Sequence, residues 1–136
     1  LDAKAGELAN LENGKKTMVI RGATGRKLPY GRVNPGDVLY FIENKGDGLV
    51  KARAEVMDVQ NSVRLSPEES ASMVQKHQDR LLLDKGLLKR FSGKRYLVLI
   101  TVKDFQVVDS FKIDRSDYGN MDDWLPVGDI NKVMVS

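Results

Sequence analysis

Residues 38–59 carry the pattern that most restricts the fold of this chain. The segments VLYFIE (38–43) and LVKARAEVMDV (49–59) are separated by NKGDG, a turn sequence that favours a β-hairpin. In the second segment small apolar residues alternate with charged ones, which is typical of an antiparallel strand buried on one face. The chain therefore needs a sheet whose inner face is covered by other elements.

The neighbouring segments supply those elements. Ser66, Pro67 and Glu69 form the sequence signature of a capped helix start. Helices are predicted around Leu8 and Leu11, which end at Asn13-Gly14, and over residues 65–83 and 84–91. Further strands are predicted over 16–21, 94–102 and 104–114, and residues 22–32 are predicted to form a loop. The expected fold class is α+β, a small barrel of short strands with flanking helices.

Length and composition indicate one globular domain over residues 1–136, with 41% hydrophobic and 30% charged residues. The chain has no cysteine, which excludes disulfides and thiolate zinc sites. It has no apolar run of about 20 residues and no visible signal peptide, so we expect a cytoplasmic protein without a membrane partner. Because the chain begins with Leu1 rather than Met, we also expect residues before it in the natural protein.

Chemistry-bearing motifs are few. The single histidine, His77, lies among apolar residues of a predicted helix, so we expect it to pack there rather than bind a metal. The segment GATGRK lacks the spacing of a nucleotide-binding phosphate loop. The carboxylate pairs Glu68-Glu69 and Asp122-Asp123 are explained by helix capping and by a polar loop. We therefore expect no cofactor, no metal and a binding module rather than an enzyme.

The net charge is +3, and all of the positive surplus lies in the first quarter of the chain. Residues 14–32 contain no acid, four glycines and six basic residues: Lys15, Lys16, Arg21, Arg26, Lys27 and Arg32. Arginine and lysine bind phosphates, and glycines let a ligand approach the backbone. An ordinary solvated surface mixes both signs of charge, so this segment favours an anionic partner.

Aromatic residues could complete such a binding surface. Tyr30 lies inside the basic segment and Trp124 lies in the tail, and either could stack a nucleic-acid base. Two alternatives stay open at this point. The basic residues could form a solvated face with the aromatic residues in the core, and Arg21 could pair with a carboxylate such as Asp37 instead of a ligand.

The motifs NGKKTMVIR, VNPGDVLYFIE and GLVKARAEV resemble those of the ASCH domain family, in the PUA-like superfamily. The family signature is roughly GxKxxExR followed by a Gly-Asp turn before the second strand. Gly14, Lys16 and Arg21 match the signature and Gly36-Asp37 matches the turn, whereas Val19 stands where Glu is usual. The resemblance covers residues 8–105 in element order and 8–58 in recognisable motif.

The resemblance implies a PUA-like pseudo-barrel of five to six mostly antiparallel strands and a cleft lined by Lys16 and Arg21. It implies binding of RNA or another single-stranded nucleic acid, with a modified base or nucleotide as a further possible ligand. On this basis Arg26, Lys27 and Arg32 would neutralise phosphates, while Tyr30 and Trp124 would stack bases.

An enzymatic alternative follows from the same resemblance. Some relatives are amidohydrolases that act on a modified nucleoside, an acylated cytidine, through the signature Lys, a Thr three residues later and a distant Glu. Here Lys16 would be the catalytic lysine, but the Thr position holds Val19. Thr17, on the same face of the strand, would lie about 6.5 Å away from the required position.

Overall fold

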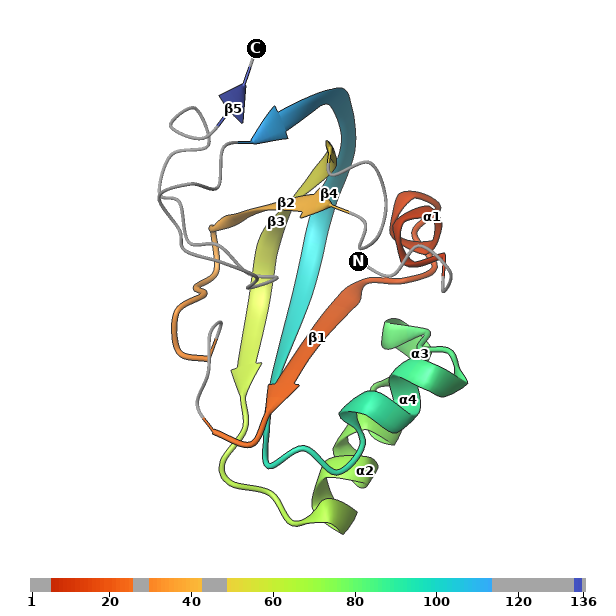
Figure 1. Ribbon diagram of the computed structural model, residues 1–136, viewed down its shortest axis with the longest axis vertical. Helices are drawn as coiled ribbons and strands as arrows, with labels where there is room; N and C mark the ends of the chain where they lie inside the picture. Colours follow the sequence, from red (N-terminus) through yellow and green to blue (C-terminus); the bar gives the residue numbers. More distant parts are fainter. Residues whose placement is uncertain (1–5, 26–29, 43–48, 114–133, 136) are drawn as a thin grey trace.

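The computed structural model describes residues 6–25, 30–42, 49–113 and 134–135. Figure 1 shows helices α2, α3 and α4 lying together on one side of a sheet, with α1 near the start of β1. The elements in chain order are α1 (Glu7–Glu12), β1 (Met18–Ala23), β2 (Val38–Ile42), β3 (Val50–Asn61), α2 (Pro67–Lys76), α3 (Gln78–Leu81), α4 (Lys85–Phe91), β4 (Tyr96–Ile113) and β5 (Met134–Val135).

The sheet is antiparallel, in the order β1-β4-β3-β2, and β5 pairs with the far end of β4. The predicted α+β class with flanking helices is confirmed. Among the described residues β1 and β2 are the two edges of this order and do not pair with each other. The closed pseudo-barrel of five to six strands therefore stays a prediction.

One strand, β4, replaces the two strands predicted over 94–102 and 104–114, and that prediction is wrong. Asp104 has a left-handed backbone with φ of 53°, and across it Arg53 and Glu55 of β3 oppose Gln106 and Lys103 of β4. Between these two pairs β3 has one residue, Ala54, and β4 has two, Asp104 and Phe105, which is the geometry of a β-bulge. The bulge absorbs the polar residue without ending the strand.

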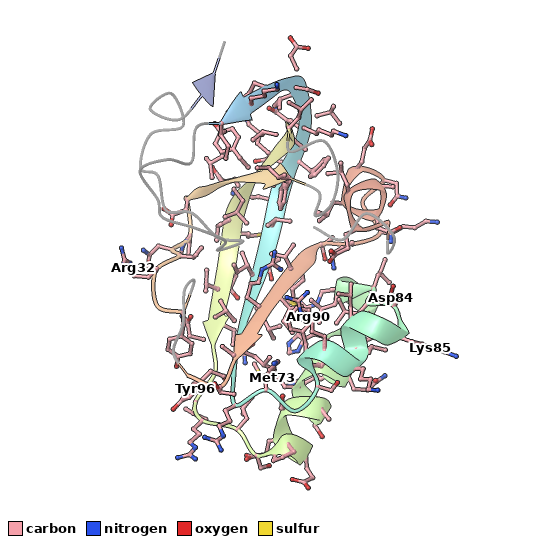
Figure 2. The ribbon with its side chains drawn as sticks, in the orientation of Figure 1. Arg32, Met73, Asp84, Lys85, Arg90 and Tyr96 are labelled. Atoms are coloured by element: carbon pink, nitrogen blue, oxygen red, sulfur yellow. The ribbon has the colours of Figure 1, made fainter. Side chains whose placement is uncertain are left out.

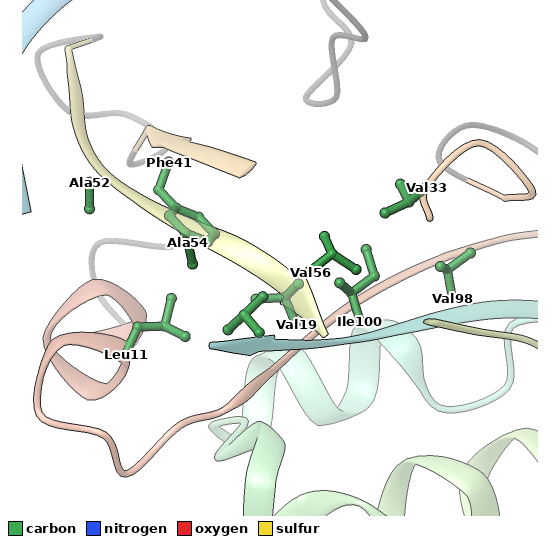
Figure 3. Close-up of a cluster of buried hydrophobic side chains, with 10 residues drawn as sticks. Leu11, Val19, Val33, Phe41, Ala52, Ala54, Val56, Val98 and Ile100 are labelled. Carbon is green, nitrogen blue, oxygen red and sulfur yellow. The ribbon is translucent and has the colours of Figure 1, made fainter. Parts of the chain in front are cut away.

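A buried core lies on each face of the sheet, and among the described strands only β1 and β4 contribute to the one beneath helices α2–α4. On the face opposite helices α2–α4 lies the strand core, drawn in Figure 3. Its residues come from α1, from strands β1 to β4 and from the connection between β1 and β2: Leu11, Val19, Val33, Phe41, Ala52, Ala54, Val56, Val98, Ile100 and Val102. Beneath the helices lies the helix core: Met18, Ile20, Val74, Leu81, Leu83, Leu87, Phe91, Leu97 and Leu99. The alternation predicted for residues 50–56 is confirmed, because the four inward side chains are 1% exposed or less.

The capped helix begins as predicted, with Ser66 Oγ accepting the Glu69 N–H at 3.1 Å and the Glu69 carboxylate accepting the Ser66 N–H at 2.9 Å. It ends earlier than predicted, because α2 stops at Lys76 and His77 separates it from α3. His77 is buried, with Nδ1 2.9 Å from the Met73 carbonyl oxygen. Within the described ranges no cluster of three potential metal ligands occurs, and no helix could span a membrane.

Gly22 belongs to β1, although the sequence predicted a loop from this residue onward. It pairs with Leu97, and a Cβ at this position would lie 2.9 Å from Leu97 Cδ2 and 3.1 Å from Lys94 Cγ. Such contacts are far inside van der Waals distance. The missing side chain therefore lets Lys94 and the buried Leu97 pack directly on the backbone of β1.

This close contact predicts a stability difference between two glycines. Gly22→Ala should lower the free energy of unfolding by about 1 kcal/mol, because an added methyl group overpacks the site. Gly25→Ala is the matched control, since no heavy atom lies within 4 Å of its Cβ position. Urea unfolding measures both variants, and equal stabilities would contradict the packing at Gly22.

Candidate nucleic-acid interface

The end of the sheet where β1 and β3 finish and β4 begins is the candidate site, called the sheet end below. Ala23 pairs with Tyr96 there, and Asn61 pairs with Val98. Beyond Asn61 the Ser62 N–H donates to the Leu97 carbonyl at 2.9 Å, and Ser62 Oγ accepts the Leu97 N–H at 2.9 Å. These bonds hold the connections that leave the sheet in fixed positions.

Tyr30 is attached to the sheet end by three contacts. Its hydroxyl donates to the Ser62 carbonyl, and its ring meets Tyr96 edge-on, with centroids 5.6 Å apart and planes at 84°. The N–H of the next residue, Gly31, donates to Asn61 Oδ1 at 3.0 Å. Tyr30 and Tyr96 are both half-buried, and Tyr30 also packs against the buried cluster of strand residues. Figure 2 shows Tyr96 beside the end of β1.

Three basic residues that the sequence analysis did not select lie at the same end. Arg64 and Arg95 are exposed, and the Leu65 N–H donates to the Arg95 carbonyl at 2.8 Å, which joins the two segments. The half-buried Lys94 packs against Gly22. A charge count could have found them, because residues 64–95 contain eight Lys and Arg but only four Asp and Glu.

Lys16, the first predicted site residue, is buried rather than exposed in a cleft. Its side chain is 0% exposed, its Nζ donates to the Leu81 carbonyl, and Glu7 Oε1 lies 3.5 Å away. Burial lowers the pKa of Lys16 below its ordinary 10.5; Glu7 opposes this shift and the positive charge of Arg21 adds to it. In this structure Lys16 joins α1, the start of β1 and α3.

The other predicted residues are distributed over several places. Arg21 is half-buried and donates from Nη1 to the Ile20 carbonyl at 2.7 Å, while Asp37 Oδ2 accepts the Asn34 N–H at 2.9 Å. Arg32 is exposed and points away from helices α2–α4 in Figure 2. The remaining three predictions lie outside the described residues: Arg26, Lys27 and Trp124.

The positions required by the amidohydrolase alternative can also be located. Val19 is 3% exposed within the strand core, so it contributes only packing. Thr17 is half-buried, its N–H donates to the Arg80 carbonyl at 3.1 Å, and its carbonyl accepts the Val102 N–H at 3.0 Å. The backbone at Thr17 is therefore fixed on both sides, next to Lys16.

No family model and no curated protein matches this sequence, but solved structures do. The ASCH protein from Zymomonas mobilis superimposes with a TM-score of 0.60 and 12% identity, over 82% of this chain and 69% of that one. The chain has an ASCH fold. Two point variants of the same Zymomonas protein, one with a tyrosine changed to phenylalanine and one with a serine changed to alanine, match with TM-scores of 0.60 and 0.59. Both are 12% identical to this chain, over 82% of it and over 71% and 70% of their own lengths. The predicted ASCH resemblance is confirmed at the level of the fold.

The buried lysine predicts a specific stability change. Lys16→Met should lower the free energy of unfolding by about 3 kcal/mol, because it removes the ammonium group that pairs with the buried carboxylate of Glu7. Lys15→Met, at the exposed neighbouring residue, is the control and should leave stability unchanged. Thermal and urea unfolding measure both. A Lys16→Met protein as stable as the control would contradict the buried pair.

The lowered pKa of Lys16 also predicts a pH dependence. Between that lowered value and the ordinary 10.5 the unfolded chain binds more protons than the native chain. The free energy of unfolding should therefore rise with pH across this alkaline window. The rise attributable to Lys16 is the difference between wild type and Lys16→Met, measured from pH 8 upward by urea unfolding. A difference that is flat with pH would contradict the shift.

Proposed function

We propose that this chain binds RNA, or single-stranded nucleic acid more generally, at the sheet end. The observation that carries the proposal is the Tyr30–Tyr96 pair at the same end of the sheet as the exposed Arg64 and Arg95. A partly exposed aromatic ring next to positive charge is what sequence-independent single-strand binding requires, because bases stack and phosphates are neutralised. The ASCH fold is compatible with the proposal, and the PUA-like pseudo-barrel remains part of it.

The proposed roles follow from the positions of the residues. Tyr30 offers a ring for a base. Arg26 and Lys27 stay assigned to phosphates on the sequence prediction, together with Arg32 and Arg21. Lys16 is assigned a positioning role, because its Nζ is already bound to Glu7 and to the Leu81 carbonyl. Trp124 stays assigned to base stacking on the sequence prediction alone.

One observation favours the amidohydrolase alternative. Lys16 and Glu7 form a buried ionisable pair, and burial lowers the pKa of the lysine; such groups are found often at catalytic sites. Under that alternative a modified nucleoside without phosphate would bind with little salt dependence, and Lys16→Met would abolish its hydrolysis. Nucleic-acid binding differs on both points, since it is salt-dependent and needs no reaction.

Salt dependence is the first test of the proposal. With about six phosphates engaged on a single strand, log affinity should fall against log salt with a slope near −4. Raising the salt from 50 to 200 mM should then weaken binding roughly 300-fold. Anisotropy of labelled single-stranded RNA, single-stranded DNA and duplex measures this directly. Failure to bind any of the three at 50 mM salt would sink the proposal.

The aromatic contribution has its own variant. Tyr30→Leu should weaken single-strand binding about tenfold or more, because stacking on an aromatic ring contributes about 1–3 kcal/mol per base. Tyr40→Leu is the matched control, since Tyr40 is half-buried and meets Phe111 in a similar edge-on contact on β2. Equal loss in both variants would show that Tyr30 contributes only to folding.

Charge reversal at Arg26 and Lys27 should weaken the binding of all nucleic-acid sequences to the same extent.

A further inference from the structure

A pocket of about 420 Å³ opens at the sheet end, between the connection from β3 to α2 and the connection from α4 to β4. The segment 64–67 forms one wall and Gly93 and Arg95 form the other. The Leu65 N–H donates to the Arg95 carbonyl at 2.8 Å, so a backbone hydrogen bond joins the two walls. The pocket is therefore built by two segments that lie far apart in the sequence.

The charge of the pocket is positive. Its lining contains the exposed arginines Arg64 and Arg95 and no acidic residue. Within the described part of the chain, neither guanidinium has a hydrogen bond or an ion pair. The nearest acids in sequence are Glu68 and Glu69, and the Glu69 carboxylate already accepts the Ser66 N–H at 2.9 Å. Two arginines that line one pocket can hold a phosphate through charge and paired hydrogen bonds.

The N-terminus of α2, which starts at this pocket, is not the source of the positive charge. Ser66 Oγ accepts the Glu69 N–H at 3.1 Å, so the first turn of α2 is capped by its own side chain. The positive charge comes from the arginines on either side. Gly93 contributes by having no side chain and a left-handed backbone, with φ of 98°, which turns the chain between α4 and β4.

We propose that this pocket binds a backbone phosphate of the nucleic acid that stacks on Tyr30, an inference that rests on the proposed function. Arg95 directly precedes Tyr96, whose ring contacts Tyr30. Because neighbouring strand residues point to opposite faces, Tyr96 lies with Val98 on the strand-core side and the pocket lies on the helix side. A bound strand therefore passes around the sheet end, with a base on one face and a phosphate on the other.

The test combines a double variant with a salt series. Arg64→Gln/Arg95→Gln should weaken binding of a labelled single-stranded RNA of about 12 nucleotides by on the order of tenfold at 0.1 M salt. It should also make the slope of log affinity against log salt shallower by about 0.7, the contribution of the one phosphate that the pocket binds. Both side chains are exposed, so the fold should be retained, and thermal unfolding checks this.

The matched control is Arg80→Gln/Lys89→Gln, which removes the same charge from exposed residues of α3 and α4 away from the pocket. It should leave the slope unchanged. If the wild type binds RNA and the pocket variant binds with the same affinity and slope, the pocket proposal is overturned and the proposed function stands. Equal losses in the two double variants would also overturn it, as a general charge effect. If the wild type binds no nucleic acid, both proposals fall.

Discussion

The hydrogen-bonded pairing of β4 with β1 and β3 is the interaction on which the other parts of the structure depend. It places Ala23 opposite Tyr96 and Asn61 opposite Val98, so three distant segments finish at one end of the sheet. Over residues 97–102 both faces of β4 are buried, one by the helix core and the other by the strand core. The same pairing therefore contributes to the stability of both cores and brings Tyr30, Arg64 and Arg95 to the sheet end.

A buried lysine is the second constraint. Lys16 connects α1 through Glu7 and α3 through the Leu81 carbonyl, and it lies at the start of β1. Removing a charged lysine from water is unfavourable, and this burial lowers the pKa of Lys16. Lys16 thus holds three elements together and keeps an ionisable pair inside the fold.

Local signals in the sequence were sufficient for much of the fold. The alternation over residues 50–56, the capping box at Ser66 and the burial of His77 are short-range patterns, and the structure has them. The continuity of β4 through Asp104 was missed, because a bulge depends on the partner strand. The contact of Tyr30 with Tyr96 was missed as well, since the two rings are far apart in the sequence and only the sheet register joins them. That Arg64 and Arg95 lie together was missed for the same reason, although a charge count over residues 64–95 marks the segment as basic.

The measurement that tests the proposed interface most directly is an amide chemical-shift map of the protein with single-stranded RNA at about 50 mM salt. We expect the largest changes at the sheet end, at the amides of Tyr30, Arg64, Gly93 and Tyr96. The amides of β2 should stay unchanged, because β2 is the far edge of the sheet order. Changes confined to β2, or no change anywhere at saturating RNA, would contradict a nucleic-acid interface at the sheet end.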